Sequence, residues 1–134
     1  MTEEFYEPAI RRSDIQYGEG YGKGLFGRLN ELDPEMSMLF QRFFHGGLYE
    51  REVLSHKVRE LCAIAALVVT DKTLQLRAHF TAAHKYGAEE KEILEVVFQM
   101  ATYIGAPSVL EALKVYEDWV ASGHTMTGFG RGEK

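Results

Sequence analysis

The chain of 134 residues is long enough for one domain that buries about 70 % of its unfolded surface. Its net charge of −5 argues against nonspecific nucleic-acid binding, and no apolar run approaches the roughly 20 residues that cross a bilayer. A single cysteine, Cys62, excludes an internal disulfide framework and a thiolate metal cage within one chain. The acidic residues 1–5 lack the apolar core of a signal peptide, so we expect a cytoplasmic protein.

Residues 1–32 are expected to form an N-terminal arm with a glycine-rich connector. The sequence is compatible with short helices over residues 3–12 and 25–32. Between them lie Gly18, Gly20, Gly22, Gly24 and Gly27. No Gly-Lys-Ser/Thr follows and no strand precedes, so this is not a phosphate-binding loop. We interpret it as a flexible connector or as an arm against a neighbouring subunit.

Clear helix signals begin at Asp33-Pro34-Glu35, which combines a capping carboxylate, a proline at the first helical position and an acid in the first turn. This helix is expected to end at Gly46-Gly47. Ser55 is placed to cap a second helix over residues 56–69. Residues 61–69 are apolar on every side, which predicts a buried central helix.

Three more helices are predicted over residues 74–86, from residue 88 onward, and over residues 109–121. Gly87 and Gly105-Ala106-Pro107 separate them. No stretch shows the period-two alternation of a strand. The sequence therefore predicts an all-α bundle of about five to six helices, with a flexible tail at residues 122–134.

The segment from Arg59-Glu60-Leu61 to residues 103–107 resembles the carboxymuconolactone decarboxylase family, which shares the alkylhydroperoxidase D-like helical fold. One matching feature is Arg-Glu-Leu leading into an alanine-rich helix. Another is His79 followed by small residues and closing as residues 85–88, Lys-Tyr-Gly-Ala. The last is Gln99 followed by Tyr103-x-Gly105-x-Pro107. The resemblance covers residues 33–121, which we take as the helical domain.

The resemblance favours the decarboxylase branch of the family. The peroxidase branch carries C-x-x-C-x-x-H, and with His79 in the last place Thr73 and Leu76 stand at the cysteine positions. A disulfide-forming cycle cannot run on these residues. The run Leu-Arg-Ala-His that ends at His79 fits the decarboxylase pattern, with Arg77 in place of a lysine. This implies a cofactor-independent lyase acting on a small carboxylated lactone, as in aromatic compound catabolism.

His79 and Glu60 are the predicted catalytic residues, because decarboxylation leaves an anion that must be stabilised and then protonated. Arg77 is predicted to bind the substrate carboxylate. It lies about 200° from His79 around the helix, so it would serve either a pocket of its own subunit or one of a neighbouring subunit. His84 and Tyr103 are further substrate-binding candidates. Structural roles stay open for all five residues. His79 and Glu60 would form a core contact, and Arg77 a surface or interface ion pair. His84 would complement the helix dipole near the end of its helix, and Tyr103 would be a packed aromatic residue.

No metal site is predicted, because His56 and Glu60 make a lone i, i+4 pair. No cofactor, nucleic acid or membrane is expected as a partner. We expect a small-molecule acid as substrate. A homo-oligomer, trimer or hexamer, is also expected, because the helix after Pro34 carries more apolar residues than a small monomer hides. Two alternatives remain open: a hydroperoxidase relative that uses Cys62 alone, and a non-catalytic oligomeric protein that binds small molecules.

Overall fold

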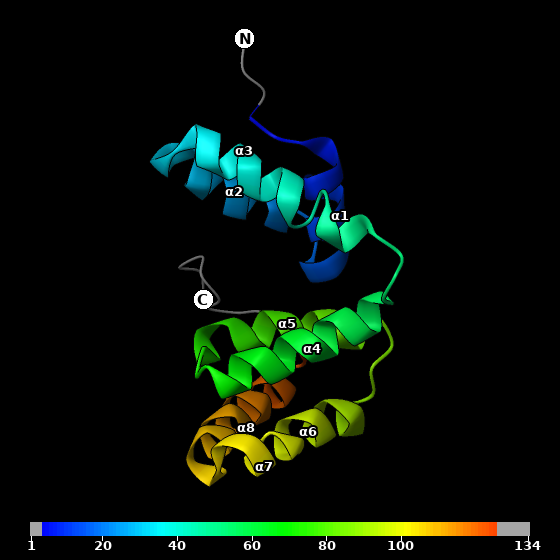
Figure 1. The fold of residues 1–134 in the computed structure, drawn as a ribbon, viewed down its shortest axis with the longest axis vertical. Coiled ribbons are helices and arrows are strands. Elements are labelled where there is room, and N and C mark those ends of the chain that lie inside the picture. The colour runs from blue at the N-terminus through cyan, green and yellow to red at the C-terminus, as the bar shows by residue number, and fades with distance from the viewer. Residues whose placement is uncertain (1–3, 126–134) are drawn as a thin grey trace. The chain divides into compact units, whose positions relative to one another are not determined.

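The computed structural model describes residues 4–125, and all regular structure in that part of the chain is helical (Figure 1). The prediction of an all-α fold is confirmed. The chain divides into two compact units, Met1–Leu54 and Ser55–Lys134, called here the N-terminal and C-terminal units. No helix among the described residues is long and apolar enough to cross a membrane.

The N-terminal unit contains helices α1 (Glu7–Tyr17), α2 (Tyr21–Leu32) and α3 (Pro34–Phe43), followed by the 3₁₀ turn η1 (Leu48–Glu50). The start of α3 is as predicted. Asp33 accepts hydrogen bonds from the backbone N–H groups of Glu35 and Met36, both at 3.1 Å. These two donors would otherwise lack a partner inside the helix.

The glycine-rich segment differs from the connector that the sequence suggested, because α2 begins at Tyr21 and includes most of its glycines. A Cβ at Gly22 would lie 3.1 Å from the Cα of Ile10, so the missing side chain lets α2 approach α1 closely. The Gly22 N–H also donates to Oδ1 of Asp14 at 2.8 Å. Gly20, at φ +88°, takes the left-handed conformation just before α2. These glycines position helices and do not form a flexible link.

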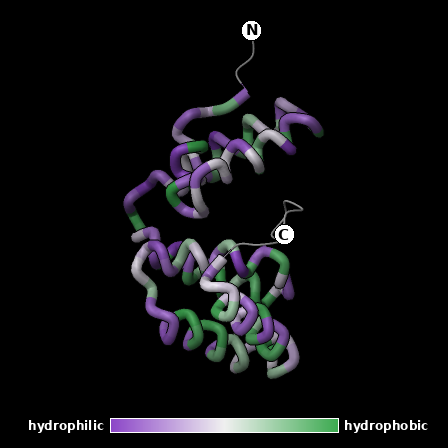
Figure 2. The backbone as a smooth tube through the Cα atoms, turned by 180° about the vertical axis from the view of Figure 1, so that it is seen from behind, coloured by the Kyte–Doolittle hydropathy of each residue, from purple (hydrophilic) through white to green (hydrophobic). Residues whose placement is uncertain are grey.

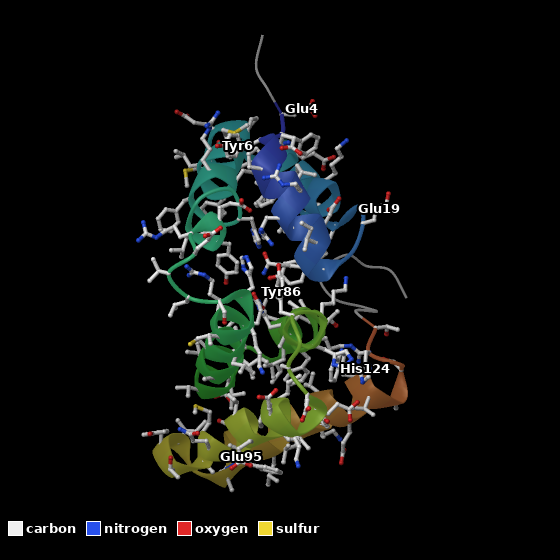
Figure 3. All side chains as sticks on the ribbon, turned by 90° about the vertical axis from the view of Figure 1, so that its right-hand side faces the viewer. Glu4, Tyr6, Glu19, Tyr86, Glu95 and His124 are labelled. Carbon is white, nitrogen blue, oxygen red and sulfur yellow. The ribbon has the colours of Figure 1, made fainter. Side chains whose placement is uncertain are left out.

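A buried glutamine ties the start of the chain to α3. The Oε1 atom of Gln41 accepts the Tyr6 N–H at 2.7 Å, and its Nε2 donates to the Glu4 carbonyl at 3.0 Å. Tyr6, which directly precedes α1, is labelled in Figure 3. The Arg42 guanidinium lies over the ring of Tyr6, 4.2 Å from its centroid. This cation–π contact adds to the same junction.

Helix α3 buries polar residues and exposes several large apolar ones. Its buried residues are Ser37 and Gln41. Phe43 is 62 % exposed and Leu39 55 %. The other large apolar residues exposed on α3 or in the segment directly after it are Met36, Phe40, Phe44 and Leu48. We call these six residues the α3 apolar face.

The C-terminal unit contains α4 (His56–Val69), α5 (Thr73–Lys85), α6 (Glu90–Gln99), α7 (Ala101–Ile104) and α8 (Ala106–Ala121). Helices α4 and α5 pack side by side, and α6 and α8 pack against them (Figure 1). Long hydrophobic stretches run along these helices (Figure 2). The largest fully buried side chains of this core are Trp119, Phe80, Ile64, Leu76 and Ile93.

The bounds of α4 match the prediction of residues 56–69, but the prediction that this helix is buried on every side was wrong. Its fully buried residues are Glu60, Ile64 and Val68, which recur every four residues along one stripe. Val69 is 40 % exposed, and Cys62, expected to be buried, is exposed as well. Although most of its residues are apolar, α4 has only one fully buried stripe within this chain.

Candidate functional site

Glu60 and His79 meet where α4 packs against α5. The Nδ1 atom of His79 lies 2.6 Å from Oε1 of Glu60. Glu60 lies on the buried stripe of α4, and its side chain is 1 % exposed. His79 lies beside the buried positions Leu76 and Ala83 of α5, and its side chain is 16 % exposed. The structure thus brings together the two residues predicted to be catalytic, with the carboxylate inside and the imidazole nearer the surface.

The chemistry of this contact follows from the burial of Glu60. Burying a carboxylate is costly unless a charge or hydrogen-bond donor compensates it. When Glu60 is ionised it can only accept hydrogen bonds, and in that state Nδ1 of His79 is the donor. This bond fixes the orientation and tautomer of the ring and makes Nε2 the nitrogen that exchanges a proton. The pair can hold an imidazolium as a proton donor, and the same contact would also suit a purely structural histidine.

Arg77 does not join this pair. One terminal nitrogen of its guanidinium donates to Oγ of Ser122 at 2.8 Å, and its Nε donates to the carbonyl of Thr125 at 3.4 Å. Both partners lie just beyond the C-terminal end of α8. The separation from His79 that the helical wheel indicated is therefore present in the structure.

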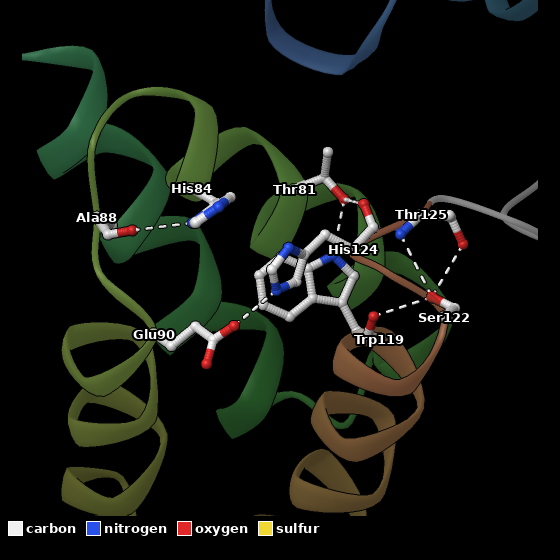
Figure 4. A network of polar contacts seen from close by, with 8 residues as sticks. All are labelled: Thr81, His84, Ala88, Glu90, Trp119, Ser122, His124 and Thr125. Atoms are coloured by element: carbon white, nitrogen blue, oxygen red, sulfur yellow. Dashed lines mark hydrogen bonds and ion pairs between the residues drawn. The ribbon is translucent and has the colours of Figure 1, made fainter.

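His84 and Tyr103 lie away from the pair too. The ring of His84 contacts Trp119 and His124, with centroid distances of 5.9 and 4.6 Å, and its Nδ1 is 3.3 Å from the Ala88 carbonyl (Figure 4). Tyr103 belongs to the short helix α7 and is 71 % exposed. The five candidate residues therefore do not form one pocket within the described part of the chain.

A second cluster escaped the sequence analysis. His124 contacts Glu90, with Nε2 2.7 Å from Oε2, and its ring lies 4.3 Å from Trp119 (Figure 4). Burial and the Glu90 carboxylate, through its charge and a hydrogen bond, raise the pKa of Tyr116. The available signal was Gly123 directly after the last helix, since a glycine there turns the chain back over the helix end. The sequence analysis places Gly123 and His124 in the tail of residues 122–134.

The comparison with known families agrees with the resemblance. Residues 34–118 match the carboxymuconolactone decarboxylase family. The chain belongs to this family. The match begins at the first residue of α3 and ends within α8, so it spans both units.

The chain is similar to three further proteins, two of which are named as decarboxylases. A 4-carboxymuconolactone decarboxylase of Acinetobacter baylyi is 24 % identical over 116 residues, which are 87 % of either chain. An uncharacterised 15.0 kDa protein of Paracoccus denitrificans is 32 % identical over 82 % of this chain and 75 % of its own. A nitrosuccinic acid decarboxylase of Metarhizium robertsii is 34 % identical over 70 residues, 52 % of this chain and 49 % of its own.

Within the carboxymuconolactone decarboxylase family, this chain offers little for thiol chemistry beside His79. Cys62 lies two residues after Glu60 on α4, a rotation of about 200°. The exposed thiol and the buried carboxylate therefore face different sides of the helix. Among residues 4–125, no group of three or more histidine, cysteine or acidic side chains is arranged to hold a metal ion.

Proposed function

We propose that this protein is a cofactor-independent decarboxylase of small carboxylated lactones or related acids. The observation that supports it is the 2.6 Å contact between His79 and a fully buried Glu60, in a chain of the carboxymuconolactone decarboxylase family. His79 is the proposed proton donor. Glu60 orients the ring and stabilises its cationic form.

The proposed step is balanced without an added cofactor. The bond between the substrate carbon and its carboxylate breaks, carbon dioxide leaves, and the electron pair remains on the substrate. A neighbouring carbonyl or similar acceptor spreads this charge. The His79 imidazolium then gives its Nε2 proton to the carbon, and solvent restores it.

The named relatives support a substrate class and not one compound. The names of two of them, 4-carboxymuconolactone decarboxylase and nitrosuccinic acid decarboxylase, describe acids that carry an electron-withdrawing lactone or nitro group. Such groups stabilise the anion that decarboxylation leaves. We therefore propose acids of this type, with aromatic catabolism as the first context to search.

We also propose that the chain forms a homo-oligomer, a trimer or a hexamer. The α3 apolar face supports this, because a contiguous exposed apolar surface usually marks an interaction site. In such an assembly Arg77 is the proposed carboxylate grip at a site that includes a neighbouring subunit. His84 and Tyr103 are proposed substrate contacts there, since neither lies at the Glu60–His79 pair.

A panel of carboxylated lactones, β-keto acids and nitro acids tests the function by carbon dioxide release. His79→Asn should lower the rate about 10²- to 10⁴-fold, the usual contribution of general acid catalysis. Lys85→Gln, on the same helix but outside the proposed site, is the matched control. Undiminished release by His79→Asn would contradict the assignment. Tight binding of an acid without turnover would favour a non-catalytic binding protein.

The exposure of Cys62 favours a second candidate, a hydroperoxidase relative that works through this thiol alone. Alkylation does not separate the two functions, because an exposed thiol reacts whatever its role. Hydroperoxide consumption by Cys62→Ser and His79→Asn does separate them. Loss of consumption only in Cys62→Ser would support the thiol, and no consumption by the unmodified protein would exclude it.

A further inference from the structure

Residues 122–125 form a short strap that turns back over the end of α8. Their main-chain and side-chain contacts reach two other helices of the C-terminal unit. His124 contacts Glu90 of α6, and Arg77 of α5 donates to Ser122 and Thr125. The His124 N–H also donates to the Trp119 carbonyl at 2.8 Å. We call residues 122–125 the C-terminal strap.

The strap needs these contacts because its backbone is not relaxed. His124 has φ +67°, in the left-handed region that residues other than glycine rarely occupy. Only the preceding residue, Gly123 at φ +79°, accepts this region without a Cβ penalty. The closed position of His124 is held by the main-chain bond to Trp119 and by the contact of its side chain with Glu90.

Its side chain lies in a group of titratable residues from three helices, of which His84 and Glu90 are drawn in Figure 4. Glu90 comes from α6, and its Oε2 is 2.7 Å from Nε2 of His124. His84 comes from α5, with its ring centroid 4.6 Å from that of His124. Tyr116 of α8 shares the Glu90 carboxylate, and Arg77 of α5 binds the strap itself. The closed strap thus places the His124 ring in contact with the Glu90 carboxylate and close to a second imidazole, that of His84.

We infer that the C-terminal strap is a proton-controlled latch, closed by the cationic ring of His124 on the Glu90 carboxylate. A cationic imidazole makes a charge-assisted bond to the carboxylate, whereas a neutral ring makes only an ordinary hydrogen bond. Histidine side chains usually change charge between pH 5 and 8. The strap is therefore held most strongly in mild acid and opens as the pH rises. This inference does not rest on the proposed decarboxylase activity.

His84 modulates the latch from the other side. A second cation on His84 would lie next to the cation on His124 and oppose closure. Replacing His84 should leave the opening at high pH in place and strengthen closure in mild acid. Replacing His124 or neutralising Glu90 should remove the pH dependence.

Trp119 reports the state of the latch. It is the only tryptophan of the chain, its indole is buried, and the ring of His124 covers it at 4.3 Å. Opening should shift its fluorescence to longer wavelength as the pH rises from about 5 to about 8. Over the same range, exchange of the His124 amide, corrected for the intrinsic effect of pH, should accelerate about fivefold or more.

Three variants complete the test. In His124→Gln, the Trp119 emission wavelength and the exchange rate of the residue-124 amide should not change with pH over this range. Glu90→Gln should keep a hydrogen bond to His124 but lose most of the pH response. His84→Gln should retain the response, which separates the latch from direct quenching by the His84 ring. Far-UV circular dichroism checks that each variant is folded. A wild-type response that persists in both His124→Gln and Glu90→Gln, or an unchanged His124 amide exchange in the wild type, would overturn the inference.

Discussion

At the scale of single residues, burial decides what the polar groups of the C-terminal unit can do. Glu60 is fully buried and contacts an imidazole that is partly exposed, so its charge can act on the chemistry through His79. Thr81 is buried as well. Its Oγ1 accepts the indole N–H of Trp119 at 3.0 Å, inside the aromatic core. One buried polar group thus orients a candidate proton donor, and the other satisfies a core side chain.

Glu60→Gln tests the orienting role. The amide keeps the size of the side chain but removes the charge that stabilises the cationic ring. In the decarboxylation assay, kcat should fall about 10²-fold while KM changes little. A melting temperature measured in parallel separates the two possible roles. A lower melting temperature with unchanged kcat would identify Glu60 as a structural residue only.

Thr81→Val should destabilise the C-terminal unit by about 1–3 kcal/mol, because the indole N–H of Trp119 would remain buried without its acceptor. Thr81→Ser keeps the hydroxyl group and is the matched control. Urea unfolding followed by Trp119 fluorescence measures both variants. Equal stability of the valine and serine variants would show that this hydrogen bond contributes nothing.

At the scale of the elements, the helices begin where side chains satisfy their first backbone donors. Asp33 does this for α3. For α6, Glu92 accepts the Glu89 N–H at 2.8 Å and pairs with Lys57 of α4 at 3.0 Å. The hydrogen bond from the Glu89 backbone, followed by the bond to Lys57, lowers the pKa of Glu92 below its ordinary value of 4.5. This residue therefore links the starts of two helices.

Asp33→Ala should lower the stability of the N-terminal unit by about 1 kcal/mol, because α3 loses the acceptor for two N–H groups. Asp33→Ser retains a capping oxygen and should lose less. Urea unfolding monitored by circular dichroism compares the two variants. A larger loss in the serine variant would argue against capping as the cause.

Glu92→Gln should show a pH-dependent effect whose sign follows from the lowered pKa. Because the folded-state pKa of Glu92 is depressed, the ionised carboxylate stabilises the fold above the unfolded value of 4.5 and ceases to do so as the pH falls. The stability difference between wild type and variant should thus be present at about pH 6 and vanish toward about pH 3. A difference that stays constant over this range would contradict the linkage.

At the scale of the whole molecule, the unusual feature is the α3 apolar face. The helix has its apolar residues outside and the polar Ser37 and Gln41 inside, the reverse of the usual order. Gln41 explains the inward side, because it binds the chain before α1. The outward side is explained if another copy of the chain covers it.

The double variant Leu39→Ser, Phe43→Ser should reduce the molar mass measured by light scattering at micromolar concentration, because it removes two of the most exposed side chains of this face. Leu110→Ser, at a 60 % exposed position of α8, is the control and should leave the mass unchanged. The mass of one chain for the unmodified protein would refute the oligomer.

Much of this architecture could be predicted, because helix starts and ends depend on neighbours a few residues apart. Asp33 and Ser55 cap α3 and α4 as expected, and α4 has the predicted bounds. The contact between Glu60 and His79 was foreseen only as one alternative. The helical wheel separates His79 from Arg77, but it cannot say which neighbouring helix either residue meets.

The sequence alone determined the all-α class, the order of the helices, the family and the residue types available for a site. Only the tertiary structure decided that α4 is packed along one stripe, that the glycines of α2 permit close packing on α1, and that His124 returns to Glu90. The reason is physical. Helix formation follows from local hydrogen bonds and spacing, whereas burial and long-range pairing depend on which surfaces of distant segments pack together.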